Sequence, residues 1–334
     1  MDARTLEPAA REVDELLNQL RTDRTPLVVW GHPEGSHTHS WIHYGFHRAL
    51  DHLGLQTSWL PDSRRSAREL RDAERAVVIT EGQADRRLKK ALRPDWIVFG
   101  HNCDADWYRE RCRFVPVHVN MLDESGYRNP RWHPEVAAAA EEQQEAPAEP
   151  QTDAETGISI LWATDLLPHE IRWTPHRRDA TDVVFVGTVW SYNADELERF
   201  AALVAERGLR WQVHKDVDAA SHEELIRSAR FAPALQGAWQ VDHGYIPCRL
   251  FKNVSYSQLA LSNNPSAEKV FDAGEIVCAG SLEDMLDGAL AAEEDGRLDD
   301  MVRSAQETVR EHHTYINRIR ELFAFYLEHH ASPA

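Results

Sequence analysis

The chain has 334 residues, of which 42% are hydrophobic and 28% charged, and its formal net charge is −18. This length favours two domains with separate cores, and the composition is typical of a soluble globular protein. The acidic balance argues against nucleic acid or an anionic membrane as a partner. No apolar run approaches the roughly 18 residues of a membrane span, and the polar start of the chain has no signal-peptide core. The four cysteines lack a CxxC spacing, which argues against a zinc site or disulfide framework and favours a reduced, cytoplasmic protein.

The first part of the chain repeats a rhythm of short apolar strand, loop and helix. After a helix over residues 1–24, the pattern predicts strands at 27–30, 56–60, 76–80, 96–100 and 114–119, with helices at 41–53 and 83–92. This alternation predicts a parallel sheet wrapped by helices, with ligands at the carboxyl ends of the strands. The loops at 31–40, 80–82 and 100–106 are therefore expected to face one crevice.

A biased segment follows, at residues 134–156. It is acidic, low in complexity and poor in large apolar groups, which predicts a mobile insertion or a frayed helix. A strand and turn at 158–168 then end the first domain, which we place at residues 1–168.

Residues 169–334 restart the same rhythm. Strands are predicted at 182–187, 211–214, 231–235, 258–262 and 275–279. Two helices are predicted at 193–207 and 298–327, and three more begin at Ser221, which opens a capping box, at residue 247 and at residue 281. The fold class is therefore α/β, with two Rossmann-like, doubly wound domains and a long C-terminal helix.

The most informative stretch is residues 243–264. Pro247 can open a helix, and Arg249 and Lys252 lie side by side in its first turns, where free N–H groups and the positive dipole end attract anions. The helix leads into a buried strand and an Asn-Asn-Pro turn. This arrangement suits a pyrophosphate, although an Arg-x-x-Lys pair also occurs on ordinary amphipathic helices with solvated cations.

The segment Arg249-Leu250-Phe251-Lys252-Asn253 resembles the Lys-Leu-Trp-Arg-Asn type segment of α-1,3-fucosyltransferases. It is also similar to the Arg-x-Phe-Glu segment of CgeB-like spore-maturation glycosyltransferases. Both families have the GT-B fold, in which two Rossmann-like domains face each other across a cleft. The resemblance covers the layout of nearly the whole chain, and its specific part is residues 182–272. Lys252 stands where many retaining members have a ribose-binding Glu, and Cys248 where fucosyltransferases have a Glu.

This resemblance implies a hexosyltransferase-like enzyme that moves a sugar from a nucleotide-sugar to an unidentified acceptor, such as a glycan, a natural product or a protein. The first domain would be the acceptor side and the second would bind the donor. Arg249 and Lys252 would neutralise the leaving diphosphate, so no metal and no cofactor beyond the nucleotide-sugar is expected. The other donor-site residues that the resemblance implies are Asn253, Gly187, Thr188, Gly244 and Tyr245, with Asp165, Asp242 and His243 as possible sugar or acceptor contacts.

Histidine is concentrated in the loop at 31–43. His39 and His43 have the i, i+4 spacing of a zincin helix, but no Glu base lies between them, so a metal site is not expected. In GT-B enzymes the loop after the first strand lines the cleft, and His37 or His39 is our candidate for a general base or for a hydrogen-bond donor to a phosphate. Solvated imidazoles at a helix start are the simpler alternative.

Two rival functions remain open from the sequence. A degenerate transferase would bind nucleotide or sugar in its cleft without turning it over. A His-dependent metal hydrolase on the loop at 31–43 would carry stoichiometric zinc.

Overall fold

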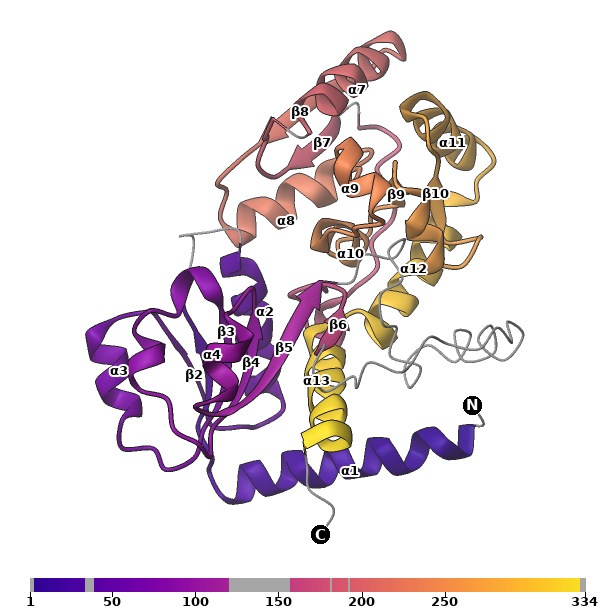
Figure 1. Cartoon of the computed structure of the whole chain (residues 1–334). Coiled ribbons are helices and arrows are strands. Elements are labelled where there is room, and N and C mark those ends of the chain that lie inside the picture. The colour runs from indigo at the N-terminus through magenta and orange to yellow at the C-terminus, as the bar shows by residue number, and fades with distance from the viewer. Residues whose placement is uncertain (1–2, 34–38, 120–156, 181, 192, 331–334) are drawn as a thin grey trace, which may run out of the picture. The chain divides into compact units, whose positions relative to one another are not determined.

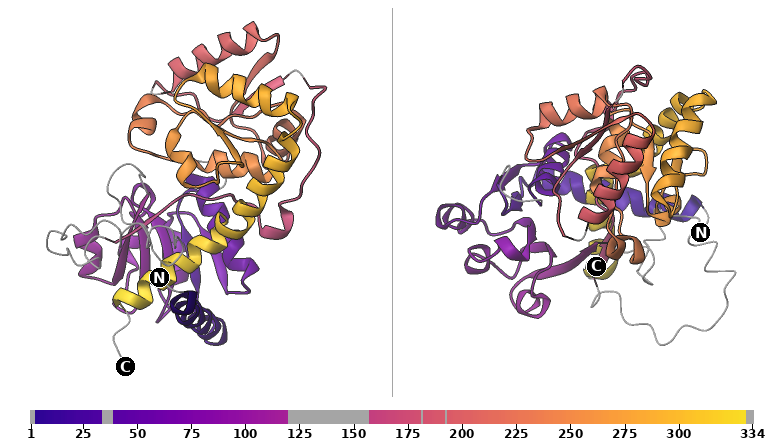
Figure 2. Two further views of the ribbon diagram at one scale, coloured as in Figure 1. Left: turned by 90° about the vertical axis from the view of Figure 1, so that its right-hand side faces the viewer. Right: turned by 90° about the horizontal axis from the view of Figure 1, so that it is seen from above.

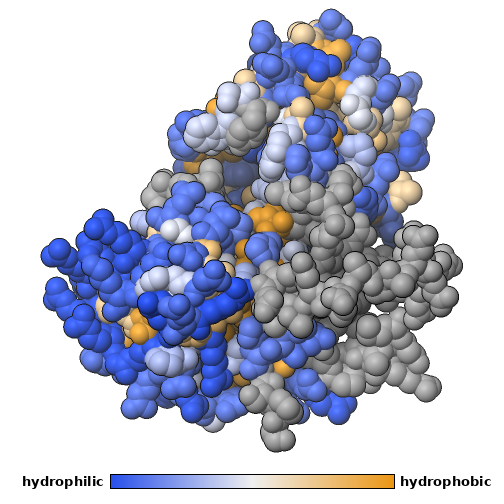
Figure 3. All heavy atoms as spheres, in the orientation of Figure 1, coloured by the Kyte–Doolittle hydropathy of each residue, from blue (hydrophilic) through white to orange (hydrophobic). Residues whose placement is uncertain are grey.

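The computed structural model describes residues 3–33, 39–119, 157–180, 182–191 and 193–330 (Figure 1). Contacts divide the chain into two compact units. Unit 1 comprises Met1–Asn120, Tyr127–Ile160 and Tyr315–Ala334, and unit 2 comprises Met121–Gly126 and Leu161–Thr314. The insertion predicted at 134–156 lies outside the described residues. The described part of the face in Figure 3 is mostly hydrophilic. Among the described helices, none combines the length and apolar character needed to cross a bilayer.

Unit 1 is built on a parallel six-stranded sheet of order β2-β1-β3-β4-β5-β6. Because β1 lies between β2 and β3, the winding direction of the chain reverses beside it, and such switch points bind ligands at the carboxyl ends of the strands. The strands are β1 (Leu27–Trp30), β2 (Thr57–Leu60), β3 (Val77–Glu81), β4 (Ile97–His101), β5 (Arg113–Val119) and β6 (Ile158–Ile160). The helices are α1 (Ala3–Thr22), α2 (His39–His52), α3 (Arg64–Leu70), α4 (Ala105–Arg109) and α13 (Tyr315–His330), with 3-10 turns η1 (Gly82–Ala84) and η2 (Leu88–Lys90).

The sheet of unit 1 is covered on both faces. All four residues of β1 are buried, as expected for a central parallel strand. On one face, Val28 and Trp30 join the apolar cluster that also contains Val78. α13 contacts α1, α2 and β6, and the left view of Figure 2 shows it, in yellow, beside α1. The Phe46 ring of α2 lies 4.7 Å from that of Tyr315, between ring centres.

Unit 2 repeats this plan with a shorter sheet. Two parallel pairs, β7 (Asp182–Val186) with β8 (Arg210–His214) and β9 (Ala260–Ser262) with β10 (Ile276–Cys278), are joined by parallel bridges to residues 231 and 234. The order is therefore β8, β7, segment 231–234, β9 and β10, with a switch point beside β7. The helices are α7 (Ala194–Glu206), α8 (Ala219–Ser228), α9 (Ala238–Asp242), α10 (Cys248–Ser255), α11 (Leu282–Glu294) and α12 (Leu298–His312), with 3-10 turns η3 (Pro168–Glu170) and η4 (Pro265–Lys269).

The side chains of β7 show how this sheet is held between two cores. Val183 and Phe185 point into one buried cluster, with residues of α7 and α11. Val184 and Val186 point into the other, with residues of α10 and α12. Alternate residues of a strand face opposite sides of a sheet, so β7 is buried on both.

Several local predictions were wrong. Residues 83–92 form two 3-10 turns instead of one helix, because the Asp62 carboxylate accepts bonds from the backbone N–H groups of Arg87 and Leu88. α8 begins at Ala219 because Asp218, rather than Ser221, is the capping residue. The pattern at 298–327 is interrupted at residues 313–314, where the backbone pairs with Thr164 instead of continuing the helix. Segment 231–235 makes isolated bridges, not a full strand.

Candidate functional site

Arg249 lies in the first turn of α10, and its guanidinium reaches the carboxyl end of β7. Its Nε donates to the Val186 carbonyl at 2.9 Å, and its Cζ lies 4.2 Å from the centre of the Phe185 ring. A Cβ added at Gly187 would lie 2.1 Å from Arg249 Nη2, so a side chain at this position would displace the guanidinium from where it lies. The cation is thus fixed at the switch point of unit 2, in the first turn of α10, where the helix dipole is positive. Such a place attracts anions.

Lys252 turns into the interior of unit 2. Its Nζ donates to Asp165 Oδ2 at 3.0 Å, and the two residues are only 6% and 7% exposed. The structure therefore brings together two predicted site residues as a buried ion pair. Their predicted contacts with diphosphate and with sugar or acceptor remain predictions.

Asn253 and Thr188 also lie near this end of the sheet. Asn253 is buried, and its Nδ2 donates to the Ala232 carbonyl at 2.8 Å, which ties α10 to segment 231–234. Thr188 follows Gly187, and its carbonyl accepts a bond from Asn193 Nδ2 at 3.3 Å. The backbone of this loop is therefore held in place, while the neighbouring Trp190 is exposed.

The candidate contacts at residues 242–245 lie at the end of α9 and directly after it. Asp242 is the last residue of that helix, and Gly244 follows it at φ +65°. The His243 ring stacks on the exposed Trp239, with ring centres 4.5 Å apart, and the Tyr245 carbonyl accepts a bond from Asn264 Nδ2 at 3.0 Å. The sequence analysis missed Trp239, an exposed aromatic surface of the kind that can stack on a sugar.

The pKa of His222 in α8 is lowered in part by the positive charges of α10. Burial, together with the charges of Lys252 and Arg249, lowers the pKa of His222 to about 3. Desolvation is the largest cause, and the two cations act in the same direction. His222 is therefore neutral near pH 7, and the sequence analysis gave it no role beyond a helix start.

This shift predicts an acid-sensitive contribution to stability. In the unfolded chain His222 takes up a proton near pH 6.5, whereas in the folded protein it does so only near pH 3, so its contribution is complete above pH 6.5 and is lost as the pH falls. Between pH 7 and pH 5, the free energy of unfolding of a His222→Gln variant should fall by up to about 2 kcal/mol less than that of the unchanged protein. Urea unfolding at both pH values measures the difference, and an identical pH dependence in the two proteins would contradict it.

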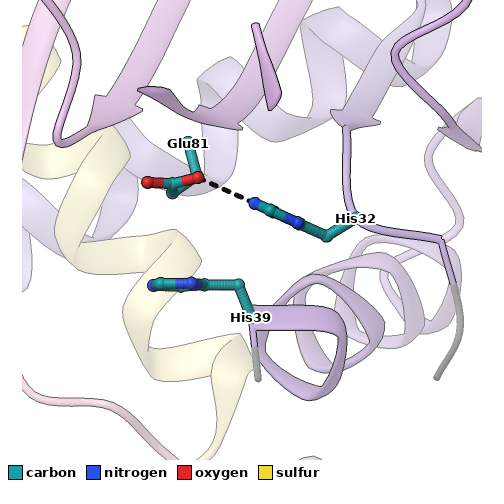
Figure 4. Close-up of side chains that lie close together, drawn as sticks. All are labelled: His32, His39 and Glu81. Carbon is teal, nitrogen blue, oxygen red and sulfur yellow. Dashed lines mark hydrogen bonds and ion pairs between the residues drawn. The ribbon is translucent and has the colours of Figure 1, made fainter. Parts of the chain in front are cut away.

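A second group of polar side chains lies at the switch point of unit 1 (Figure 4). His32 follows β1, Glu81 ends β3 and His39 begins α2. His32 Nε2 lies 2.7 Å from Glu81 Oε2, and the His32 and His39 rings are stacked with centres 5.6 Å apart. The rings of His43 and His101 come next, 5.4 Å from His32 and 5.6 Å from His39, respectively. We call His32, His39 and Glu81 the histidine–glutamate cluster.

The backbone around this cluster is held by close contacts. The Gly31 carbonyl accepts a bond from Trp59 Nε1 at 3.0 Å, and a Cβ added at Gly31 would lie 2.7 Å from the Cβ of Ala84. His32 adopts a left-handed φ of +33°, which is rare for a residue other than glycine. Glu81 Oε2 also accepts a bond from the backbone N–H of Gln83 at 2.9 Å. The positions of His32 and Glu81 are thus fixed by the turns that follow their strands.

The predicted histidines have different outcomes. His37 lies outside the described residues. His39 lies in the cluster, and its role as a base or as a hydrogen-bond donor to a phosphate stays a prediction. The sequence analysis missed Glu81 and gave no role to His32. Both come just after apolar runs that predict parallel strands. Because the loops at the carboxyl ends of such strands converge, this position was the signal in the sequence that could have identified both residues.

Two kinds of comparison with known proteins, one by sequence family and one by structure, found matches to this chain. Residues 171–324 match the family model described as "Glycosyl transferase-like". The structure is similar to a solved "alpha-glucosyltransferase (AGT) in complex with UDP", with TM-score 0.58, 9% identity and coverage of 90% of this chain and 99% of that chain. It is also similar to a solved "alpha-glucosyltransferase in complex with UDP and a 13-mer DNA containing a HMU base". There the TM-score is 0.60 and the identity 9%, and the match covers 89% of this chain and 98% of that chain. No curated protein sequence matches the chain.

These findings confirm the predicted α/β fold of GT-B type with two Rossmann-like domains. They also confirm the resemblance to glycosyltransferases, which in sequence falls on residues 171–324.

Proposed function

We propose that the protein is a glycosyltransferase that moves a hexosyl group from a nucleotide-sugar to an acceptor, with the donor bound by unit 2. The observation that carries the proposal is the position of Arg249, fixed against Gly187 at the carboxyl end of β7 and at the start of α10. Both residues lie within the range that matches the glycosyl transferase-like family. A diphosphate at this point would meet a guanidinium and the positive end of a helix dipole.

The same geometry supports a donor site that needs no metal. As the bond to the sugar breaks, negative charge grows on the leaving diphosphate, and a cation already fixed in place stabilises that charge without reorganising. The Val186 carbonyl and the Phe185 ring hold Arg249 in this way. The nucleotide-sugar is the co-substrate, and an imidazole of His37 or His39 is the proposed base for the acceptor.

For the acceptor we propose a chemical class. The formal net charge of −18 disfavours a nucleic-acid acceptor, because the field of the whole chain would repel phosphates. A nucleotide-sugar is anionic as well, but Arg249 gives it a local cation. A glycan, a natural product or a protein is the proposed acceptor, and a cytoplasmic location stays a prediction.

Gly187→Ala tests the donor site without removing a charge. The added Cβ would overlap Arg249 Nη2 and displace the guanidinium. We measure thermal shifts with UDP, GDP, ADP, CMP and dTDP, with and without EDTA. A nucleotide at a hundred times its Kd adds about 2.7 kcal/mol of stability, which raises Tm by several degrees. The shift should survive EDTA in the unchanged protein and be largely lost in Gly187→Ala.

Gly280→Ala is the matched control, because a Cβ there meets no atom within 4 Å, and it should keep the full shift. The absence of a shift with every nucleotide, or an equal shift in Gly187→Ala, would overturn the donor site. Incubation of the corresponding nucleotide-sugar with the protein separates the rival function, since binding with neither transfer nor hydrolysis would identify a binding module.

A further inference from the structure

The histidine–glutamate cluster offers three metal-binding side chains to one point in unit 1. One ligand atom from each of His32, His39 and Glu81 lies within 4.8 Å of the other two. Two imidazoles and a carboxylate form a ligand set found in zinc and other first-row divalent metal sites. Around a tetrahedral zinc ion with bonds of about 2.0–2.1 Å, ligand atoms lie about 3.3 Å apart. Small side-chain rotations would therefore bring the three groups to bonding distance.

Glu81 supplies an independent reason to expect a ligand. The residue is 1% exposed, and its Oε2 already pairs with His32 and with the N–H of Gln83. Within the described part of the chain, the buried Oε1 has no hydrogen-bond partner. A buried acceptor left unsatisfied destabilises the folded protein, and more so when it is charged. A cation at the cluster would remove that destabilisation.

A simple hydrogen-bonded pair explains less of this arrangement. The bond between His32 and Glu81 accounts for one carboxylate oxygen and one ring. It accounts neither for Glu81 Oε1 nor for the His39 ring stacked on that of His32, and Figure 4 shows the three side chains around one space.

We propose that His32, His39 and Glu81 bind a divalent transition-metal ion of the zinc type. His32 follows β1, Glu81 ends β3 and His39 begins α2, at the switch point of unit 1, where doubly wound sheets bind ligands. Three protein ligands leave a fourth position open, as in zinc sites that bind water or a substrate oxygen. This proposal departs from the expectation that the protein binds no metal.

The proposed ion does not share its protein ligands with the donor diphosphate. Its ligands belong to unit 1, whereas Arg249 and Gly187 belong to unit 2. Nucleotide binding should therefore not need the ion. With His39 engaged as a ligand, His37 is the histidine of the two that stays a candidate for the base.

Zinc titration of the full chain tests the proposal. Protein stripped with EDTA and dialysed is titrated with ZnCl2 in a calorimeter, and Co²⁺ serves as a second probe through its visible absorption. We expect one equivalent of tight binding and a rise in Tm. His39→Ala and Glu81→Gln should each weaken zinc binding by at least tenfold, while the far-UV circular dichroism spectrum stays unchanged. His52→Ala, in the exposed last turn of α2, is the matched control and should bind as the unchanged protein does.

Two results would overturn the metal site. One is less than an equivalent of zinc on the stripped protein. The other is equal binding by His39→Ala, Glu81→Gln and the control, which would show adventitious binding to other histidines. The nucleotide shifts are measured on the same preparations, so a protein that binds nucleotide but no zinc refutes only the metal site. A protein that binds zinc but no nucleotide refutes only the proposed transferase.

Discussion

Replacing Arg249 by alanine is expected to lower kcat/KM for the nucleotide-sugar by about 10²–10³-fold, which is the cost of losing one fixed donor to charge that develops in a transition state. The guanidinium is held by the Val186 carbonyl and the Phe185 ring, so it meets the diphosphate without first reorganising. KM for the donor should rise and kcat should fall together, because the cation interacts with the bound diphosphate and more strongly with the leaving one. Initial rates over a range of donor concentrations measure both.

Two further variants separate charge, geometry and folding at this position. Arg249→Lys keeps the charge but lacks the forked guanidinium, and an intermediate loss of activity is expected. Arg199→Ala removes an exposed arginine from α7 in the same unit and should leave the kinetics unchanged. Melting curves check that each variant is folded. A folded Arg249→Ala protein with unchanged kcat/KM would refute the assignment of the donor site to this residue.

The largest effect on stability is expected at the Lys252–Asp165 pair. Lys252→Ala leaves the carboxylate of Asp165 buried without its cation, and such a loss costs about 3–5 kcal/mol. For a unit of this size the change corresponds to a fall in Tm on the order of 10 °C. Thermal unfolding followed by tryptophan fluorescence measures it.

A double variant distinguishes a buried ion pair from a donor contact. Replacing both charges, in Lys252→Met with Asp165→Leu, removes the uncompensated charge and should recover most of the lost stability. If Lys252 also contacts the diphosphate, as the sequence suggested, the recovered protein will still have weak donor binding. A double variant no more stable than Lys252→Ala would contradict the account of the pair.

Local sequence patterns predicted much of the fold. Apolar runs such as 27–30 and 183–186 became buried parallel strands because four consecutive apolar residues are stable only between two covered faces. The helix that Pro247 opens was also predicted. Helix ends were less predictable, since Asp218 and Ser221 both suit a cap and tertiary packing selects between them. At residues 83–92 the carboxylate of Asp62, which is remote in sequence, decides the conformation.

The sites were predictable only where their residues are close in sequence. Arg249 and Gly187 were both candidates, but their contact depends on how α10 packs against β7. Lys252 and Asp165 are 87 positions apart, and nothing local in either segment indicates that they pair. Glu81 comes close to His32 only because the sheet places β3 next to β1. Which distant residues meet in space depends on the order of the strands in the sheet, and a local sequence pattern does not determine that order.

The return of residues 315–330 to unit 1 has a consequence for the order of events during synthesis. α13 contacts α1, α2 and β6, and the ring of Tyr315 fills the space beside Gly45. A ribosome must therefore make the whole of residues 161–314 before the helix that covers this face is available. Unit 2 can close on itself as soon as it emerges, whereas the early part of unit 1 waits with apolar surface uncovered, a state that chaperones recognise. The part of the protein that is synthesised first is thus completed last.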